Sequence, residues 1–553
     1  MKIRMPICIE DFKKVREQYY LVDKTRFIQQ VLDEHGKVTL LTRPRRFGKT
    51  LTMSMLEYFF SVDKKKVSKE IFKGLYIEQA GQEYTKEQGQ YPVIFISFKE
   101  LKNLSWEDML DNWSVFLRTV YLKYKYVYQS ERIDEDMKAD YLRITERKAT
   151  RNELANALAR LMEMLAAYYG KRVIVLIDEY DVPAQKAWED GFYDECINFV
   201  KQLLGNALKT NKNLEFAVLT GVLRIAKESI FSDLNNFEVC SVLHEQYGDA
   251  IGFTPEDIQQ MAQDLQMEEL LPDIKKWYDG YHFGSDEIYN PWSVLNFFKQ
   301  KRLGDYWVNT SGNTILGSLL QHQTAKQEED LLALLRGTHV FAVVREGVTY
   351  EEIHHSRDAL YTMLVATGYL TVLNTKRIPS GIFCELALPN REVKDIFQQE
   401  VLERFHAGME PSELYVLVQH LVHGEIEPFS EGLAKYITQL VSVYDTANKE
   451  SFYHGLVLGM TALVLPEYTV ESNRESGYGR FDVALFPKRK EANGVILEFK
   501  VAQQEDELES KAHEALQQIQ EKEYDATFEQ RGVRHVWKYG IAFCDKKAYI
   551  MMK

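Results

Sequence analysis

The sequence of 553 residues lacks the features that mark secreted, disulfide-linked and membrane-spanning proteins. Its five cysteines are scattered without paired spacing, which argues against a disulfide framework or a zinc site. This cysteine usage favours a reducing cytoplasm. No hydrophobic run approaches the length of a membrane span, and the first residues lack the apolar core of a secretory signal. We therefore expect a cytoplasmic protein with no membrane partner.

The sequence also lacks an excess of basic charge. It has 68 lysine and arginine residues against 82 aspartate and glutamate residues, a net charge of −14. Because phosphate binding needs local positive charge, this balance argues against tight, non-specific coating of nucleic acid. It does not exclude a metal-dependent nuclease, whose site is itself acidic. The length and the ordinary hydrophobic content of 45% predict two to four globular domains.

What the sequence does contain is a nucleotide-binding pattern near its beginning. An apolar run at 38–41, typical of a buried strand, precedes Arg43–Thr50, and a segment with helical apolar spacing follows. A helix that begins after such a tight loop offers unpaired N–H donors and a positive dipole end to a phosphate. Lys49 would reach the β- and γ-phosphates, the Thr50 hydroxyl would ligate Mg²⁺, and Gly48 would let the backbone approach closely. The alternative is an ordinary surface turn before a helix.

A second motif of the same kind lies downstream. The continuous apolar run at 173–177 predicts a strand covered on both faces, and it ends in Asp178 and Glu179. A carboxylate at such a strand end holds Mg²⁺ in phosphoryl-transfer enzymes, and a following glutamate can polarise the attacking water. The alternative is an exposed pair of carboxylates at a strand end. Strands that alternate with helices predict a doubly wound parallel sheet with its ligand at the carboxyl ends.

Several segments resemble the bacterial AAA-ATPase-like family. They are Arg43–Thr50, Ile177–Pro183, Leu219–Val222 with Ser232–Asn236, Trp277–Tyr281 with Asn290–Ser293, and Leu388–Val393. The family has Arg-Pro-Arg-Arg-Phe-Gly-Lys in its nucleotide-binding loop, so Arg43 departs from the general glycine pattern but not from the family. The resemblance covers nearly the whole chain. It implies ATP and Mg²⁺ as cofactors and a C-terminal PD-(D/E)XK nuclease domain.

The resemblance also implies further nucleotide-site residues. The loop residues expected to bind the cofactor are Arg45, Arg46, Phe47, Gly48, Lys49 and Thr50. Thr220 ends the next predicted strand, at 214–221, where related ATPases place a polar residue that senses the γ-phosphate. Arg224 could stabilise charge on the transferred phosphate, in cis or from a neighbouring subunit, or it could form a structural salt bridge.

The C-terminal part contains a second candidate site. Two predicted strands, at 477–486 and 494–500, are separated by a polar turn that suits a hairpin. Asp482 lies on the first strand, and Glu498 and Lys500 lie two residues apart on the second, so they share one face. The two carboxylates could hold Mg²⁺, which would activate a water, and Lys500 would orient that water or stabilise developing charge. Gln518, on a predicted helix at 506–524, resembles the extra motif of RecB-like nucleases.

These patterns predict an α/β protein with three parts. Residues 1–253 would form a P-loop ATPase core, 254–440 a helical, winged-helix-like lid and linker, and 441–553 a restriction-endonuclease-like α/β domain. Metal ligands would be Thr50 and Asp178 in the first part and Asp482 and Glu498 in the last.

The expected function is an ATP-binding and ATP-hydrolysing protein that gates a Mg²⁺-dependent nuclease-like domain. Its partner would be nucleic acid, with DNA favoured over RNA, and a homo-oligomer is compatible with this interpretation. One alternative is a non-catalytic, nucleotide-dependent switch whose nuclease fold binds nucleic acid or a protein. Another is an assembly motor, for which Arg224 is the candidate finger.

Overall fold

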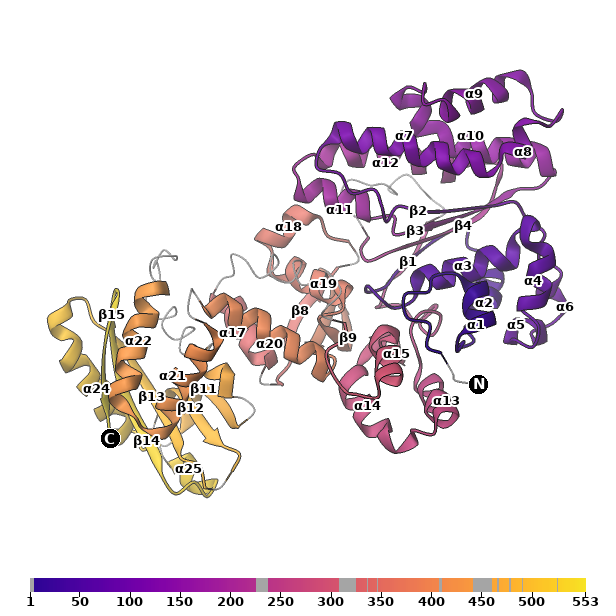
Figure 1. Cartoon of the computed structure of the whole chain (residues 1–553). Coiled ribbons are helices and arrows are strands. Elements are labelled where there is room, and N and C mark those ends of the chain that lie inside the picture. Colours follow the sequence, from indigo (N-terminus) through magenta and orange to yellow (C-terminus); the bar gives the residue numbers. More distant parts are fainter. Residues whose placement is uncertain are drawn as a thin grey trace. The chain divides into compact units, whose positions relative to one another are not determined.

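The computed structural model describes residues 4–224, 237–307, 325–335, 337–345, 347–406, 410–440, 460–464, 467–476, 479–489, 491–524 and 526–553. The chain divides into two compact units, the first made of residues 1–310 and 341–392 and the second of residues 311–340 and 393–553 (Figure 1). Among the described residues, no helix is long and apolar enough to cross a membrane.

A parallel five-stranded sheet in the order β2-β3-β4-β1-β5 lies at the centre of the first unit. Its strands are β1 Val38–Thr42, β2 Val93–Ser97, β3 Val173–Asp178, β4 Leu214–Gly221 and β5 Phe237–Cys240. Every residue of β1 and β3 is buried, as expected for strands covered on both faces. Because β4 lies between β1 and β3, the loops after these three strands meet at one edge of the sheet.

Helices cover both faces of this sheet (Figure 1). Helix α3 (Lys49–Phe60) packs against β2 and β3 on one face, and α10 (Arg151–Tyr169) and α12 (Tyr193–Leu208) pack against β3 and β4 on the other. The other helices before β4 are α1 Phe12–Gln18, α2 Arg26–Glu34, α4 Lys65–Ile71, α5 Tyr76–Gln79, α6 Gln82–Thr85, α7 Trp106–Lys123, α8 Lys125–Tyr128, α9 Glu135–Thr145 and α11 Val182–Glu189. The predicted doubly wound fold is confirmed.

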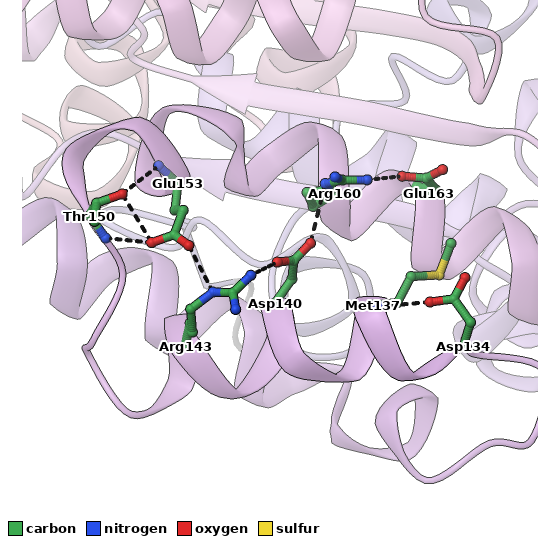
Figure 2. A network of polar contacts seen from close by, with 8 residues as sticks. All are labelled: Asp134, Met137, Asp140, Arg143, Thr150, Glu153, Arg160 and Glu163. Atoms are coloured by element: carbon green, nitrogen blue, oxygen red, sulfur yellow. Dashed lines mark hydrogen bonds and ion pairs between the residues drawn. The ribbon is translucent and has the colours of Figure 1, made fainter.

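A capping box and a network of ion pairs fix the helices α9 and α10. A reciprocal capping box between Thr150 and Glu153 begins α10, as Figure 2 shows. Arg143 of α9 contacts both Asp140 and Glu153, and Arg160 of α10 lies 3.3 Å from Asp140. A single surface ion pair contributes little, but this connected network fixes α9 against the start of α10.

The middle of the chain contains more strands than the sequence predicts. Two short hairpin strands, β6 (Tyr281–Phe283) and β7 (Asp286–Ile288), follow α13 Pro255–Leu265 and α14 Leu271–Tyr278 and precede α15 Pro291–Gln300. A three-stranded sheet contains β8 Val340–Val344, β9 Thr371–Ile378 and β10 Gly381–Ala387, with α18 Tyr350–His355 and α19 Arg357–Thr367 between β8 and β9. The sequence predicted only one of these strands, near 369–373. Strands β6, β7 and β8 have three to five residues, too few to show a clear alternation, and β10, with seven residues, was also missed.

The second unit is a mixed α/β fold. Its sheet has the order β11-β12-β13-β14-β15, with β13 and β14 parallel and the other pairs antiparallel. The strands are β11 Tyr468–Ser476, β12 Gly479–Pro487, β13 Gly494–Val501, β14 Val536–Cys544 and β15 Lys547–Met552. The helices are α17 Ala325–Leu335, α20 Arg391–His406, which begins in the first unit, α21 Pro411–His423, α22 Ile426–Leu440, α24 Leu508–Glu521 and α25 Ala526–Gln530.

The predicted hairpin between the two C-terminal site strands is confirmed, since β12 and β13 are antiparallel neighbours. Helix α24 packs against β13 and β14. Residues 441–459, 477–478 and 232–236 lie outside the described residues. The boundary near residue 441, and the three-part division that depends on it, therefore stay predictions.

Candidate nucleotide and metal sites

The loop between β1 and α3 folds around its lysine. Gly48, immediately before α3, has a positive φ of 99°, a conformation that favours glycine. The Lys49 ammonium is buried and donates hydrogen bonds of 2.8 Å to the carbonyl oxygens of Arg43 and Pro44. Burial lowers the pKa of Lys49, and the nearby Glu179, Asp181 and Asp178 carboxylates oppose this effect. A bound phosphate could replace the two carbonyl oxygens as the hydrogen-bond acceptor of the Lys49 ammonium.

Asp178, the last residue of β3, contacts Thr220 near the end of β4 and Thr50 in the helix that follows β1. Its carboxylate accepts a hydrogen bond of 2.8 Å from the Thr50 hydroxyl and one of 2.5 Å from the Thr220 hydroxyl. All three residues were predicted for this site, and the insertion of β4 between β1 and β3 explains why they meet. Hydroxyl and carboxylate oxygens are the ligands that Mg²⁺ prefers, so Thr50 and Asp178 fit a metal beside the phosphates.

Glu179 has an unusual backbone conformation for a glutamate, with φ of 52°. Such left-handed residues cluster at functional sites, because the surrounding structure must hold them there. Burial raises the pKa of Glu179, the Asp178 carboxylate adds to the shift, and Lys49 opposes it. The side chain is therefore close to the charged groups of the loop, as a water-polarising base requires.

Arg224 follows a segment that a buried carboxylate fixes in place. Asp181 accepts hydrogen bonds from the backbone N–H groups of Val222 and Leu223, at 2.8 and 3.0 Å. Residues 225–236 lie outside the described part of the chain. Whether Arg224 reaches a phosphate in cis or in trans therefore stays a prediction.

Arg43 is a structural residue at the position where other nucleotide-binding loops have glycine. It is fully buried, and its guanidinium donates hydrogen bonds of 2.9 Å to the carbonyl oxygens of Thr42, Cys240 and Tyr247. It also lies over the Phe283 ring, 4.8 Å from the centroid. These contacts tie the loop to the end of β5 and to the segment after it.

Arg45, Arg46 and Phe47, further along the loop, differ in their surroundings. Arg45 donates a hydrogen bond of 2.9 Å to Gln185, and the Arg46 guanidinium lies 4.3 Å from the Trp292 ring centroid. Phe47 is buried with its ring 5.0 Å from that of Tyr281. Any contact of Phe47 with a nucleotide would therefore come from its backbone.

The C-terminal site brings four predicted residues together around one carboxylate. Gln518 of α24 donates a hydrogen bond to Glu498 Oε1 and accepts one of 2.6 Å from the Lys500 ammonium. Lys500 Nζ lies 3.6 Å from Glu498 Oε1, and Gln518 also lies 3.2 Å from the hydroxyl of Tyr524. Asp482 accepts a hydrogen bond of 2.7 Å from the backbone N–H of residue 499.

Glu498 is the residue of this site that most clearly points to a ligand. Its side chain is buried, and its Oε2 atom has no hydrogen-bond partner within the described part of the chain. Burial raises the pKa of Glu498 to about 8, the Asp482 carboxylate adds to the shift, and Lys500 opposes it. A buried polar atom without a partner is costly, and a cation held with Asp482 would satisfy it.

A complete protein-only metal cage is not seen in the described residues, since no group of three or more histidine, cysteine, aspartate or glutamate side chains converges there. Asp482 and Glu498 would thus supply two ligands, and water or a phosphate oxygen would complete the shell, as is common for Mg²⁺.

Comparison with known proteins finds a family match for each of the two parts of the chain that contain these sites. Residues 6–231 match a family described as predicted AAA-ATPase, and residues 448–553 match the PD-(D/E)XK nuclease superfamily. The chain joins an AAA-ATPase-like domain to a PD-(D/E)XK nuclease superfamily domain. These two domains support a nucleotide-binding and nuclease-like function.

One relative matches nearly the whole length of this chain. It is an uncharacterized protein in the vnfD 5′ region of Azotobacter chroococcum mcd 1, 27% identical over 554 residues. The match covers 96% of this chain and 94% of the relative.

Sequence reasoning missed several residues around the nucleotide loop. Asp181 belongs to a predicted motif, but nothing local shows that it holds a segment 41 residues away. Trp292 and Trp307 contact the loop from residues far along the chain. Their aromatic character was visible in the sequence, but their positions beside the loop depend on the tertiary fold.

Proposed function

We propose that this AAA-ATPase-like protein binds and hydrolyses ATP and that its nucleotide state controls a Mg²⁺-dependent nuclease site acting on nucleic acid, with DNA favoured over RNA. The observation that carries the first half is the Asp178 carboxylate, which is hydrogen bonded to Thr50 and Thr220 beside the buried Lys49. In the nucleotide-bound state, Lys49 would contact the phosphates, Thr50 and Asp178 would hold Mg²⁺, and Glu179 would take a proton from the attacking water.

The observation that supports the second half is the Oε2 atom of Glu498, which has no hydrogen-bond partner among the described residues and belongs to a carboxylate close to Asp482 and Lys500. Bound between the carboxylates, Mg²⁺ would lower the pKa of a coordinated water and neutralise charge on the scissile phosphate. Lys500 would orient the water for attack on phosphorus and stabilise the developing negative charge. Gln518 would hold both Lys500 and Glu498 in these positions.

The test is a cleavage assay on single- and double-stranded DNA and RNA with Mg²⁺, with and without ATP. We expect the wild-type protein to cleave at least one substrate in an ATP-dependent manner. Asp482→Asn should abolish cleavage and retain ATP binding, whereas Asp506→Asn, on an exposed turn of the same unit, should leave cleavage unchanged. Lys49→Ala should abolish the response to ATP.

Binding of nucleic acid by the wild-type protein without any cleavage would contradict the nuclease proposal. The chain would then be a nucleotide-dependent switch, an interpretation that its net charge of −14 also allows.

A further inference from the structure

A buried carboxylate outside these two sites holds two segments of the first unit in place. Glu392, the second residue of α20, is fully buried. Its carboxylate accepts a hydrogen bond of 2.7 Å from the Ser293 hydroxyl and bonds of 2.6 and 2.8 Å from the backbone N–H groups of Tyr306 and Trp307. Because truncation would leave these donors unsatisfied in a dry interior, the carboxylate fixes the position of both segments.

The segment that contains Tyr306 and Trp307 contacts the nucleotide-binding loop directly. The indole N–H of Trp307 donates a hydrogen bond of 3.3 Å to the carbonyl oxygen of Arg45. In a trans peptide unit, the carbonyl and the following N–H point in opposite directions. Holding the Arg45 carbonyl toward Trp307 therefore directs the Arg46 N–H the other way, as required of a loop whose N–H groups bind an anion.

The segment that contains Ser293, at the start of α15, contacts Arg46, the next residue of the same loop. Trp292, adjacent to Ser293 on α15, lies under the Arg46 guanidinium. The backbone of Arg46 is in the left-handed region, with φ of 70°. The indole N–H of Trp292 also donates a hydrogen bond of 2.9 Å to the Tyr306 carbonyl, which joins the two segments. Two successive loop residues are thus held by two tryptophans, and one carboxylate anchors both tryptophans.

We propose that Glu392 is a positioning residue for the nucleotide-binding loop and acts on it through Trp307 and Trp292. The inference rests on the proposed binding of ATP by that loop. Helix α20 begins in the first unit and continues into the second, the unit that contains the nuclease-like site. By linkage, a nucleotide that favours one loop conformation also favours the matching arrangement around Glu392, at the start of this helix.

The test measures ATP affinity by titration calorimetry in variants matched for size. Trp307→Phe removes the N–H donor and retains most of the ring, and we expect about three- to tenfold weaker binding from the loss of one hydrogen bond. Trp106→Phe, on α7, is the control and should bind ATP as the wild type does. Glu392→Gln should also bind normally, because its carbonyl can accept both N–H groups and its amide can donate to Ser293.

Glu392→Ala should bind ATP at least as weakly as Trp307→Phe. The double variant Trp307→Phe/Glu392→Ala should be no weaker than Glu392→Ala alone, since two changes along one chain of contacts do not add. Additive losses, or unchanged affinity in Trp307→Phe, would overturn the inference while leaving ATP binding in place. Failure of the wild-type protein to bind ATP would overturn the proposed function as well. If Glu392→Ala does not fold, the ATP affinities of Trp307→Phe and of its control Trp106→Phe still test the inference.

Discussion

The hydroxyl of Thr50 donates a hydrogen bond of 2.8 Å to the carboxylate of Asp178, although 128 residues separate them along the chain. The other carboxylate oxygen accepts a bond from Thr220. Each oxygen of Asp178 is therefore already directed at a group that would share a metal or a phosphate with it. Thr50 and Asp178 would hold Mg²⁺ through their oxygens, and this coordination would replace the hydrogen bond between them.

Lys49→Ala is predicted to weaken ATP binding by roughly 100-fold, because it removes a charged donor to the phosphates. The measurement is titration calorimetry with Mg²⁺ and ATP. Since Lys49 also donates to two loop carbonyls, thermal unfolding without nucleotide should be compared, to separate lost ligand contact from lost loop structure. Lys148→Ala, at an exposed surface ion pair, is the control. Unchanged affinity in Lys49→Ala would reject this loop as the ATP site.

Glu179→Gln is predicted to retain ATP but to hydrolyse it about 10²–10⁴-fold more slowly, the range expected for loss of a general base. Phosphate release under saturating ATP measures the rate. The matched control is Glu189→Gln on the following helix, which should hydrolyse normally. Turnover of Glu179→Gln at the wild-type rate would mean that another group positions the water.

Arg43→Gly is predicted to destabilise the first unit by at least about 3 kcal/mol, although it restores the residue that is usual at this position. The substitution removes a buried guanidinium and leaves three carbonyl oxygens without their donor. Thermal unfolding measures the effect. Arg26→Ala, whose side chain is 63% exposed, should change stability little. Retained stability in Arg43→Gly would show that the buried network is dispensable.

The stability of the first unit is predicted to depend on pH through Glu392. Burial raises the pKa of Glu392 to about 7, its three hydrogen bonds oppose the shift, and the Asp305 charge adds to it. The nearby Tyr278 and Tyr281 stay neutral, since burial raises the pKa of each. Between the ordinary value of 4.5 and about 7, the folded protein therefore binds a proton that the unfolded chain has released.

The free energy of unfolding should accordingly fall as pH rises through this window, by about 3 kcal/mol at most, and then level off. Glu392→Gln cannot ionise and should lack this component. The difference in Tm between wild type and variant, measured from pH 4 to 8, provides the check. Parallel Tm curves for the two proteins would contradict it.

The parts of the sites that were predictable depend on short stretches of sequence. Lys49 and Thr50 follow a strand and begin a helix, and this context is visible within about 20 residues. Glu498 and Lys500 share a face because strand alternation has a period of two, and a short turn brings Asp482 to the neighbouring strand. Such local rules predicted the fold class and brought the candidate residues to the correct elements.

The remainder depends on contacts that no local pattern encodes. Glu392 holds Trp307 across 85 residues, and it carries a charge, which favours the surface. Its burial follows from three donors that only the tertiary fold brings together. Arg43 is a similar case: the sequence showed only that it replaces the usual glycine, and two of its three carbonyl partners lie about 200 residues away.

The strand order of the parallel sheet has a consequence for synthesis of the protein. In the described part of the chain, strand β1, which leads into the nucleotide-binding loop, pairs with β4 and β5, and the nearer of these partners along the sequence ends about 180 residues later. At 5–20 residues per second, the ribosome would need roughly 10–40 s to deliver that partner. During this interval, β1 and its apolar side chains have no sheet to join. Nascent chains shorter than about 220 residues should therefore be the ones that chaperones bind and proteases attack.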